Sequence, residues 1–389
     1  MADLPLARAT GPSPLPAHLG VVAHVYRTAL SDAALDPGLA DDVARAALTR
    51  MDGFLDGVDA WRTAPRPPKP ARPTALWRRG NSSLHAYGAR TAPPVLVVPS
   101  LINRAEILDL TSELSMLRGL ARQGLNPVLL DWGAPCAQTE AFGLADYIAQ
   151  RLLPALDALT EHVDRKPALL GYCLGGTMSA ALLSRRPDAA TSLICLAAPW
   201  AFPRDASLPG GGLRAAAIGL GAHRLEALLT ACAASFGCVP GLVYQSLFAA
   251  IDPMQALPKF RAFAQMRLGS AQAQRFVAVE DWLAANRDTT LAVARDVLIH
   301  LQMEDRLAKG RFDVLGGPVN AGSVTVPSLV LAGQRDNIAP PALAQPLAEQ
   351  IPSATLLSPD LGHVGAIVSA RAPGEVWDPI AQFLVSKRR

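Results

Sequence analysis

A cysteine flanked by glycines stands in the segment GYCLGGT, which covers residues 171–177. The pattern G-x-C-x-G places Cys173 where many hydrolases carry a nucleophilic serine. An apolar run precedes the segment and a helical pattern follows it, as in the strand–turn–helix that exposes a nucleophile. The alternative is that Cys173 is a small buried residue before a glycine-rich turn.

The glycines around Cys173 have separate expected roles. Gly171 and Gly175 leave room for the strained backbone of the nucleophile, and Gly176 lets the following helix pack close to the strand. The N-terminus of that helix lies under Cys173 and would favour its thiolate. The backbone N–H of Leu174 is expected to point to where an oxyanion would form.

An acid and a base follow Cys173 in the order that such a site requires. Asp336 lies just past a strong strand in LVLAGQRDNIAP, and His363 lies past the last strand in PDLGHVGAI. Asp336 alone could cap a helix or turn, and His363 alone could be an ordinary loop histidine. Together, in the order nucleophile, acid, histidine, they predict a catalytic triad with Cys173. The other histidines lie before the expected sheet, at a helix end or in a helical insertion.

The spacing of apolar runs predicts the fold that positions these residues. From residue 92 onward, short aliphatic runs bounded by Gly, Pro or Asp alternate with helix-length segments. This alternation predicts a mostly parallel sheet with helices on both faces, and the motif around Cys173 identifies it as the α/β-hydrolase fold. Residues 91–199 and 323–389 are expected to form this core. Residues 200–322 are expected to form a helical cap without a convincing strand, which covers Cys173 and moves to admit substrate.

The remaining composition limits the function classes. Residues 1–90 are expected to be a helical and Pro-rich lead-in, with a helix at roughly residues 19–56. The net charge of +3 and the 18% of charged residues do not suggest a nucleic-acid-binding protein. Five scattered cysteines without a CxxC pair indicate neither a disulfide framework nor a zinc site. Without a signal-peptide pattern or a convincing membrane span, the chain is expected to be cytoplasmic.

Several segments, taken in order, resemble the polyhydroxyalkanoate synthase family. Members of this family carry a cysteine in a lipase-like motif, as GYCLGGT does. VPSLINRAEILDL is similar to the family's loop after an early strand, and GLNPVLLDWGAP is similar to the short synthases that work with a second subunit. FVAVEDWLAAN and APGEVWDPI resemble its cap motif and C-terminal helix region. The resemblance covers about residues 90–385. One departure is Asn337, where the family usually has a histidine.

The resemblance implies a polymerising acyltransferase with Cys173 as nucleophile and His363 as its base. Asp336 would either orient His363 or assist the attacking hydroxyl. Leu174 and Ile102 are the expected backbone oxyanion donors. A thiolate suits this chemistry, because exchange with an acyl-CoA thioester gives another thioester that stays activated for transfer.

The expected partners are 3-hydroxyacyl-CoA, the polyester granule surface, and either a second synthase subunit or a second copy of the chain. Neither a cofactor nor a metal is expected. Two other functions stay open at this point: a cysteine-dependent hydrolase of esters or thioesters, and a non-catalytic granule-associated homologue. The sequence leaves the acyl chain length undecided.

Overall fold

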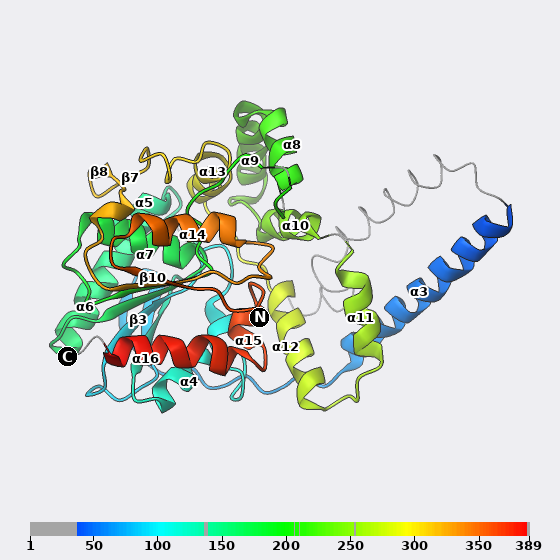
Figure 1. Ribbon diagram of the computed structural model, residues 1–389, viewed down its shortest axis with the longest axis horizontal. Coiled ribbons are helices and arrows are strands. Elements are labelled where there is room, and N and C mark those ends of the chain that lie inside the picture. The colour runs from blue at the N-terminus through cyan, green and yellow to red at the C-terminus, as the bar shows by residue number, and fades with distance from the viewer. Residues whose placement is uncertain (1–36, 136–138, 206, 210, 253, 387–389) are drawn as a thin grey trace. The chain divides into compact units, whose positions relative to one another are not determined.

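The computed structural model describes residues 37–135, 139–205, 207–209, 211–252 and 254–386 (Figure 1). Its chain divides into two compact units. One unit comprises residues 1–69 and 242–286, and the other comprises residues 70–241 and 287–389. No helix in the described part is long and apolar enough to span a membrane.

The second unit is built on an eight-stranded sheet with the order β1-β2-β4-β3-β5-β6-β9-β10. The pairings β1/β2 and β2/β4 are antiparallel, and all other neighbours in the sheet are parallel. The strands are β1 (Ala75–Arg79), β2 (Ser82–Ala86), β3 (Pro94–Val98), β4 (Asn126–Asp131), β5 (Ala168–Tyr172), β6 (Leu193–Leu196), β9 (Ser328–Leu331) and β10 (Ala354–Leu357).

The strands expected from the apolar runs are present, as β3, β4, β5, β6, β9 and β10. Every residue of β3, β5, β6 and β9 is buried, as continuous apolar strands of a sheet covered on both faces should be. The expected mostly parallel α/β sheet is therefore confirmed.

Two strands lie in the region that the sequence suggested was a lead-in. β1 and β2 pair antiparallel at one edge of the sheet, so the expected boundary near residue 90 falls between strands of the same sheet. β2 gave no apolar run because its buried positions include Ser82, Ser83 and His85. These polar groups are satisfied locally: Ser82 donates to the Trp132 carbonyl, and the His85 ring bonds Ser83 Oγ and the Pro73 carbonyl.

Helices cover both faces of this sheet. In Figure 1, α4 and α16 lie together below it and α14 lies above it. The helical elements of this unit outside the long insertion are η1 (Ala105–Leu108), α4 (Met116–Arg122), α5 (Leu144–Tyr147), η2 (Ile148–Leu152), α6 (Leu153–Val163), α7 (Leu174–Arg185), α14 (Pro341–Gln350), α15 (Gly365–Val368), η5 (Pro373–Trp377) and α16 (Asp378–Ser386).

The chain between β6 and β9 is mostly helical, as the sequence suggested. Two short strands also occur there, and they pair as a two-stranded sheet that is too short to give a sequence signal. The elements are α8 (Gly211–Leu220), α9 (Ala222–Phe236), α10 (Gly241–Ile251), α11 (Ala256–Ala264), α12 (Ala271–Ala284), α13 (Leu291–Arg295), η3 (Asp296–Leu301), β7 (Asp313–Val314), β8 (Gly317–Pro318) and η4 (Ala321–Ser323).

The first unit has its own small core. It is formed by α3 (Pro37–Thr63) packed against α11, with Phe54 and Phe260 in edge-to-face contact at 5.9 Å. A β-carbon at Gly57 would lie 2.0 Å from the Phe260 carbonyl oxygen, so glycine permits this close helix packing. α3 ends at Thr63, beyond the helix end expected near residue 56. Residues 19–36 of that expected helix lie outside the described residues.

Candidate active site

Cys173 occupies a sharp turn between β5 and α7. Its φ of 54° and ψ of −128° are strained for a non-glycine residue. The turn is fixed on both sides, because Cys173 N–H donates to the Leu196 carbonyl of β6 and its own carbonyl accepts from Gly176 N–H. This is the strand–turn–helix arrangement that the motif predicted, with Cys173 at its apex.

The glycines of the turn are required by close backbone approach. A β-carbon at Gly171 would lie 2.3 Å from Gly176 Cα, and one at Gly175 would lie 2.1 Å from the Val98 carbonyl oxygen. At Gly176 it would lie 2.6 Å from Ala198 Cβ. The start of α7 is therefore pressed against the ends of β3 and β6, which places Cys173 at the carboxyl edge of the sheet.

Gly175→Ala is expected to destabilise the fold by about 3 kcal/mol or more, because the clash is with backbone that cannot rotate away. Gly219→Ala is the matched control, since Gly219 is helical and has nothing within 4 Å of its would-be β-carbon. That change should be neutral or slightly stabilising. Thermal unfolding of the two variants would measure the difference. Equal midpoints would show that the turn is looser than the structure indicates.

Asp336 and His363 meet at the ends of neighbouring strands. Asp336 follows β9, His363 follows β10, and His363 Nδ1 lies 2.7 Å from Asp336 Oδ2. The other carboxylate oxygen, Oδ1, accepts the N–H groups of Ile338 at 2.8 Å and Ala339 at 2.7 Å. Burial alone would raise the pKa of Asp336, but the charge and hydrogen bond of His363 and the two N–H donors hold this pKa below its usual value.

His363 also interacts with Cys173. Burial acts to lower the pKa of His363, but the charge of Asp336, the charge of Cys173 and hydrogen bonds to both side chains raise this pKa well above its usual value. The structure thus brings together Cys173, His363 and Asp336, the three residues expected from the sequence. Such an arrangement can hold a thiolate beside an imidazolium, the activated state of a cysteine nucleophile.

The expected oxyanion donors come from two elements, the start of α7 and the loop after β3. Leu174 is the first residue of α7 and follows Cys173 directly, as the motif requires. Ile102 lies in the loop after β3, and its N–H donates to Ser100 Oγ at 3.4 Å, near the limit for a hydrogen bond. An incoming oxyanion could replace so weak a partner. The role of both N–H groups stays a prediction.

Tyr172, the residue before Cys173, also contacts His363. Its ring centroid lies 5.3 Å from that of the imidazole, and its hydroxyl donates to the His363 carbonyl at 3.3 Å. Tyr172 was not among the expected site residues, because it stands at a variable position of the G-x-C-x-G motif. The sequence signal that could have identified it is an aromatic residue directly before the nucleophile.

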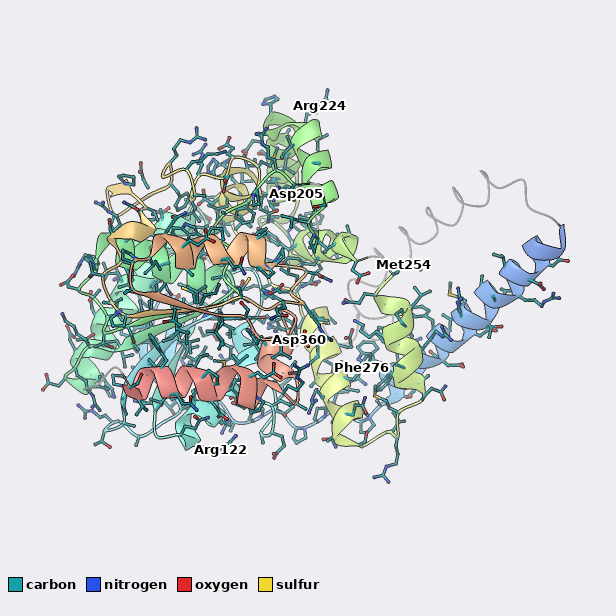
Figure 2. All side chains as sticks on the ribbon, in the orientation of Figure 1. Arg122, Asp205, Arg224, Met254, Phe276 and Asp360 are labelled. Atoms are coloured by element: carbon teal, nitrogen blue, oxygen red, sulfur yellow. The ribbon has the colours of Figure 1, made fainter. Side chains whose placement is uncertain are left out.

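The loops that carry Asp336 and His363 are joined by backbone and by charge. Arg335 N–H donates to the Leu361 carbonyl, and a β-carbon at Gly333 would lie 2.4 Å from that carbonyl oxygen. The Arg335 guanidinium binds both oxygens of Asp360 at 2.6 Å, and Asp360 is labelled in Figure 2. This bidentate pair links Arg335, the residue next to Asp336, to the loop that carries His363.

Arg335→Ala is expected to lower kcat about 2- to 5-fold with little change in stability, because an exposed ion pair contributes little to folding. The pair should matter through loop position, so exchanging the charges in Arg335→Asp with Asp360→Arg should recover part of the loss. Arg186→Ala is the control, since Arg186 forms a surface pair with Asp188 at 3.8 Å. A kcat equal in all variants would show that the pair does not position the loops.

Other groups in the described residues are poorer site candidates. Cys195 is buried in β6, and burial raises the pKa of its thiol. His300 and Asp296 are bonded at 2.8 Å, but Asp296 also accepts the Leu144 N–H and so joins two elements of the fold. The described part of the chain contains no group of three His, Cys, Asp or Glu residues placed to hold a metal ion.

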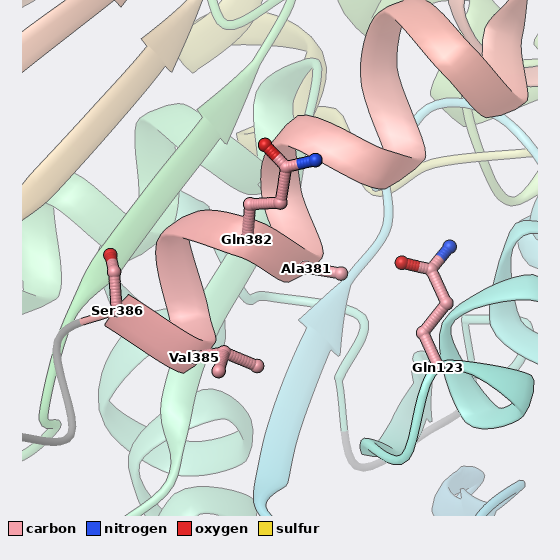
Figure 3. A pocket seen from close by; sticks show the side chains of 5 residues that line it. All are labelled: Gln123, Ala381, Gln382, Val385 and Ser386. Carbon is pink, nitrogen blue, oxygen red and sulfur yellow. The ribbon is translucent and has the colours of Figure 1, made fainter.

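A groove of about 580 Å³ lies at α16 and the end of α4 (Figure 3). Its lining residues are Gln123, Ala381, Gln382, Val385 and Ser386. Its hydroxyl, on Ser386, donates to the Phe383 carbonyl at 3.0 Å, and Gln123 is already bonded to Asp378 at 2.9 Å. The chemistry of the chain therefore centres on Cys173 rather than on this groove.

Comparison with known proteins agrees with this geometry. Residues 93–370 match the alpha/beta hydrolase fold family. The chain is 27% identical over 298 residues to the poly(3-hydroxyalkanoate) polymerase subunit PhaC of Haloferax mediterranei, covering 76% of this chain and 59% of that protein. It is 28% identical over 302 residues to the subunit of the same name from Synechocystis, covering 76% and 78%. The resemblance to the synthase family is confirmed.

Proposed function

The chain belongs to the α/β-hydrolase fold family, and we propose that it polymerises 3-hydroxyacyl-CoA into polyhydroxyalkanoate with release of CoA. One observation carries the proposal: a cysteine at the apex of the strained turn, paired with His363 and Asp336, in a chain similar to poly(3-hydroxyalkanoate) polymerase subunits. A serine at this position would suit ester hydrolysis, whereas a thiolate exchanges readily with a thioester.

In the first half-reaction the Cys173 thiolate attacks the acyl-CoA carbonyl. A bond forms between Sγ and the acyl carbon, and the carbonyl oxygen becomes an oxyanion facing the N–H groups of Leu174 and Ile102. When the oxyanion collapses, the bond from the acyl carbon to the CoA sulfur breaks. The imidazolium of His363 gives its proton to that sulfur, and CoA leaves as the thiol.

In the second half-reaction the hydroxyl of another unit or chain attacks the Cys173 thioester. His363 takes the hydroxyl proton as the new ester bond forms, and the bond from the acyl carbon to Sγ breaks. This step regenerates the thiolate beside an imidazolium. Water must be excluded here, and burial serves that need, because only 5% of Cys173 and 7% of His363 is exposed.

The burial of Cys173 also means that acyl-CoA enters only if part of the protein moves. We propose that the parts of the expected cap that belong to the same unit as Cys173, residues 200–241 and 287–322, open for this purpose. The names of these relatives describe each of them as a polymerase subunit. This supports a second synthase subunit or a second copy of this chain as a partner. Contact with the granule surface would follow from the same product, an apolar polyester.

Product analysis with 3-hydroxybutyryl-CoA tests the proposal, with CoA release and covalent labelling of Cys173 measured in the same samples. Polymer as the product would support it. Free 3-hydroxybutyrate in the amount of CoA released would instead establish a cysteine-dependent hydrolase. Absence of both CoA release and labelling would indicate a non-catalytic homologue. Because labelling needs only the first half-reaction, it reports on the site even if chain growth requires a partner subunit.

A further inference from the structure

The aromatic ring of Tyr172 packs against the imidazole ring of His363. The two rings are tilted by 36°, with their centroids 5.3 Å apart, and only 2% of Tyr172 is exposed. Asp336 holds the same imidazole at its edge, through Nδ1. The histidine is therefore fixed in its plane by a carboxylate and across its plane by an aromatic ring.

We propose that Tyr172 is a positioning residue that holds His363 beside Cys173 and favours the protonated imidazole. The face of an aromatic ring carries negative electrostatic potential and attracts a cation within about 6 Å of its centroid. That attraction is stronger where water is excluded, as it is around these buried side chains. Tyr172 thus stabilises the imidazolium half of the thiolate–imidazolium pair.

The charged groups around His363 act in the same direction. Asp336 reaches it from the loop after β9, and Cys173 from the turn before α7, and both raise its pKa against the effect of burial. On the loop of His363 itself, Asp360 is already paired with Arg335 and Arg371. Burial raises the pKa of Tyr172 well above its usual value, so the phenol stays neutral and acts through its ring.

The hydroxyl of Tyr172 has a separate and smaller role. It donates to the His363 carbonyl at 3.3 Å, which is long for an O–H donor, and so it holds the backbone rather than the imidazole. Ring and hydroxyl can therefore be removed one at a time. Tyr172→Phe deletes only the hydroxyl, and Tyr172→Leu deletes the ring as well.

Titration of His363 by NMR of its Cε1–H group tests the proposal, with the signal assigned by its loss in His363→Gln. The wild-type midpoint should lie well above 6.5. Tyr172→Phe should keep that midpoint within a few tenths of a unit. Tyr172→Leu should lower it, with proton binding weaker by about 3- to 30-fold, the range that cation–π contacts span from exposed to buried sites. The sign follows because removing a stabiliser of the charged form lowers the pKa.

Tyr147→Leu is the matched control, because Tyr147 is also buried but its ring contacts are with Trp132 and Phe142. It should leave the His363 midpoint unchanged. An unchanged midpoint in Tyr172→Leu would overturn the proposal, and so would an equal shift in Tyr172→Phe or Tyr147→Leu. The inference concerns the reaction proposed above, but the titration does not use substrate. Its failure can therefore be told apart from failure of the polymerase assay.

Discussion

Cys173→Ala should abolish acyl transfer and leave the fold intact. The substitution removes the only atom that can attack the thioester, and a small side chain at the apex of the turn contributes little packing. The backbone bonds that fix the turn, to Leu196 and from Gly176, do not involve the thiol. CoA release should fall to the background of the assay, while the far-UV circular dichroism and the thermal midpoint should stay close to those of the wild type.

Cys173→Ser extends this prediction to the nature of the nucleophile. A hydroxyl needs far stronger activation than a thiol, so the serine variant should lose most of its synthase activity. Cys232→Ala is the cysteine control, since Cys232 is partly buried in α9 and lies outside the triad. CoA turnover by Cys173→Ala at the wild-type rate would remove Cys173 from the mechanism.

The sheet was predictable where its strands are apolar along their whole length. β3, β5, β6 and β9 are buried at every residue, and such strands give continuous aliphatic runs in the sequence. The strand β2, which lies between β1 and β4, was not predictable in this way, because its buried Ser83 and His85 satisfy each other through a 2.9 Å hydrogen bond. A buried polar pair leaves no hydrophobic signal, although it costs little once bonded.

The three site residues were predictable because each of them lies just after a strand. Cys173, Asp336 and His363 each follow a parallel strand, and parallel strands bring their carboxyl ends to one edge of a sheet. No comparable rule predicts which residues of two loops come into contact. The bidentate pair of Arg335 and Asp360 joins residues 25 positions apart, and its partners are fixed only when both loops are folded.

The division of the chain shows a further limit of the sequence pattern. Residues 242–286 read as part of one helical stretch with their neighbours, yet they form a unit with residues 1–69. Periodicity reports which face of a helix is apolar, but not which distant helix will cover it. Here α11 packs against α3 through Phe260 and Phe54, and the sequence of neither helix predicts this pairing.

Asp336→Asn should slow both half-reactions together, by about 10⁴-fold, as for other triads that lose their aspartate. The resemblance left two roles open: orienting His363, or assisting the attacking hydroxyl. In the structure Asp336 is 2% exposed, and its Oδ2 accepts from His363 Nδ1 at 2.7 Å. Its Oδ1 already accepts two backbone N–H groups. Both carboxylate oxygens are thus already engaged within a buried site, and these contacts favour orientation of His363.

The same contacts fix how an asparagine would lie. Its carbonyl oxygen must face the N–H groups of Ile338 and Ala339, so its amide N–H₂ would face His363 Nδ1. Nδ1 would then have to accept, and the proton would move to Nε2. An imidazole in that tautomer cannot take a proton from Cys173 or from a hydroxyl.

Rapid-quench measurement can separate the two roles of Asp336, with CoA release and covalent acyl-enzyme followed in the same reaction. For Asp336→Asn we expect both to appear slowly and in step, because the first chemical event is already impaired. His363→Gln should block acylation of Cys173 and give neither signal. Fast CoA release with acyl-enzyme that accumulates and does not transfer would contradict the orienting role. It would show instead that Asp336 leaves its present bonds to assist the incoming hydroxyl.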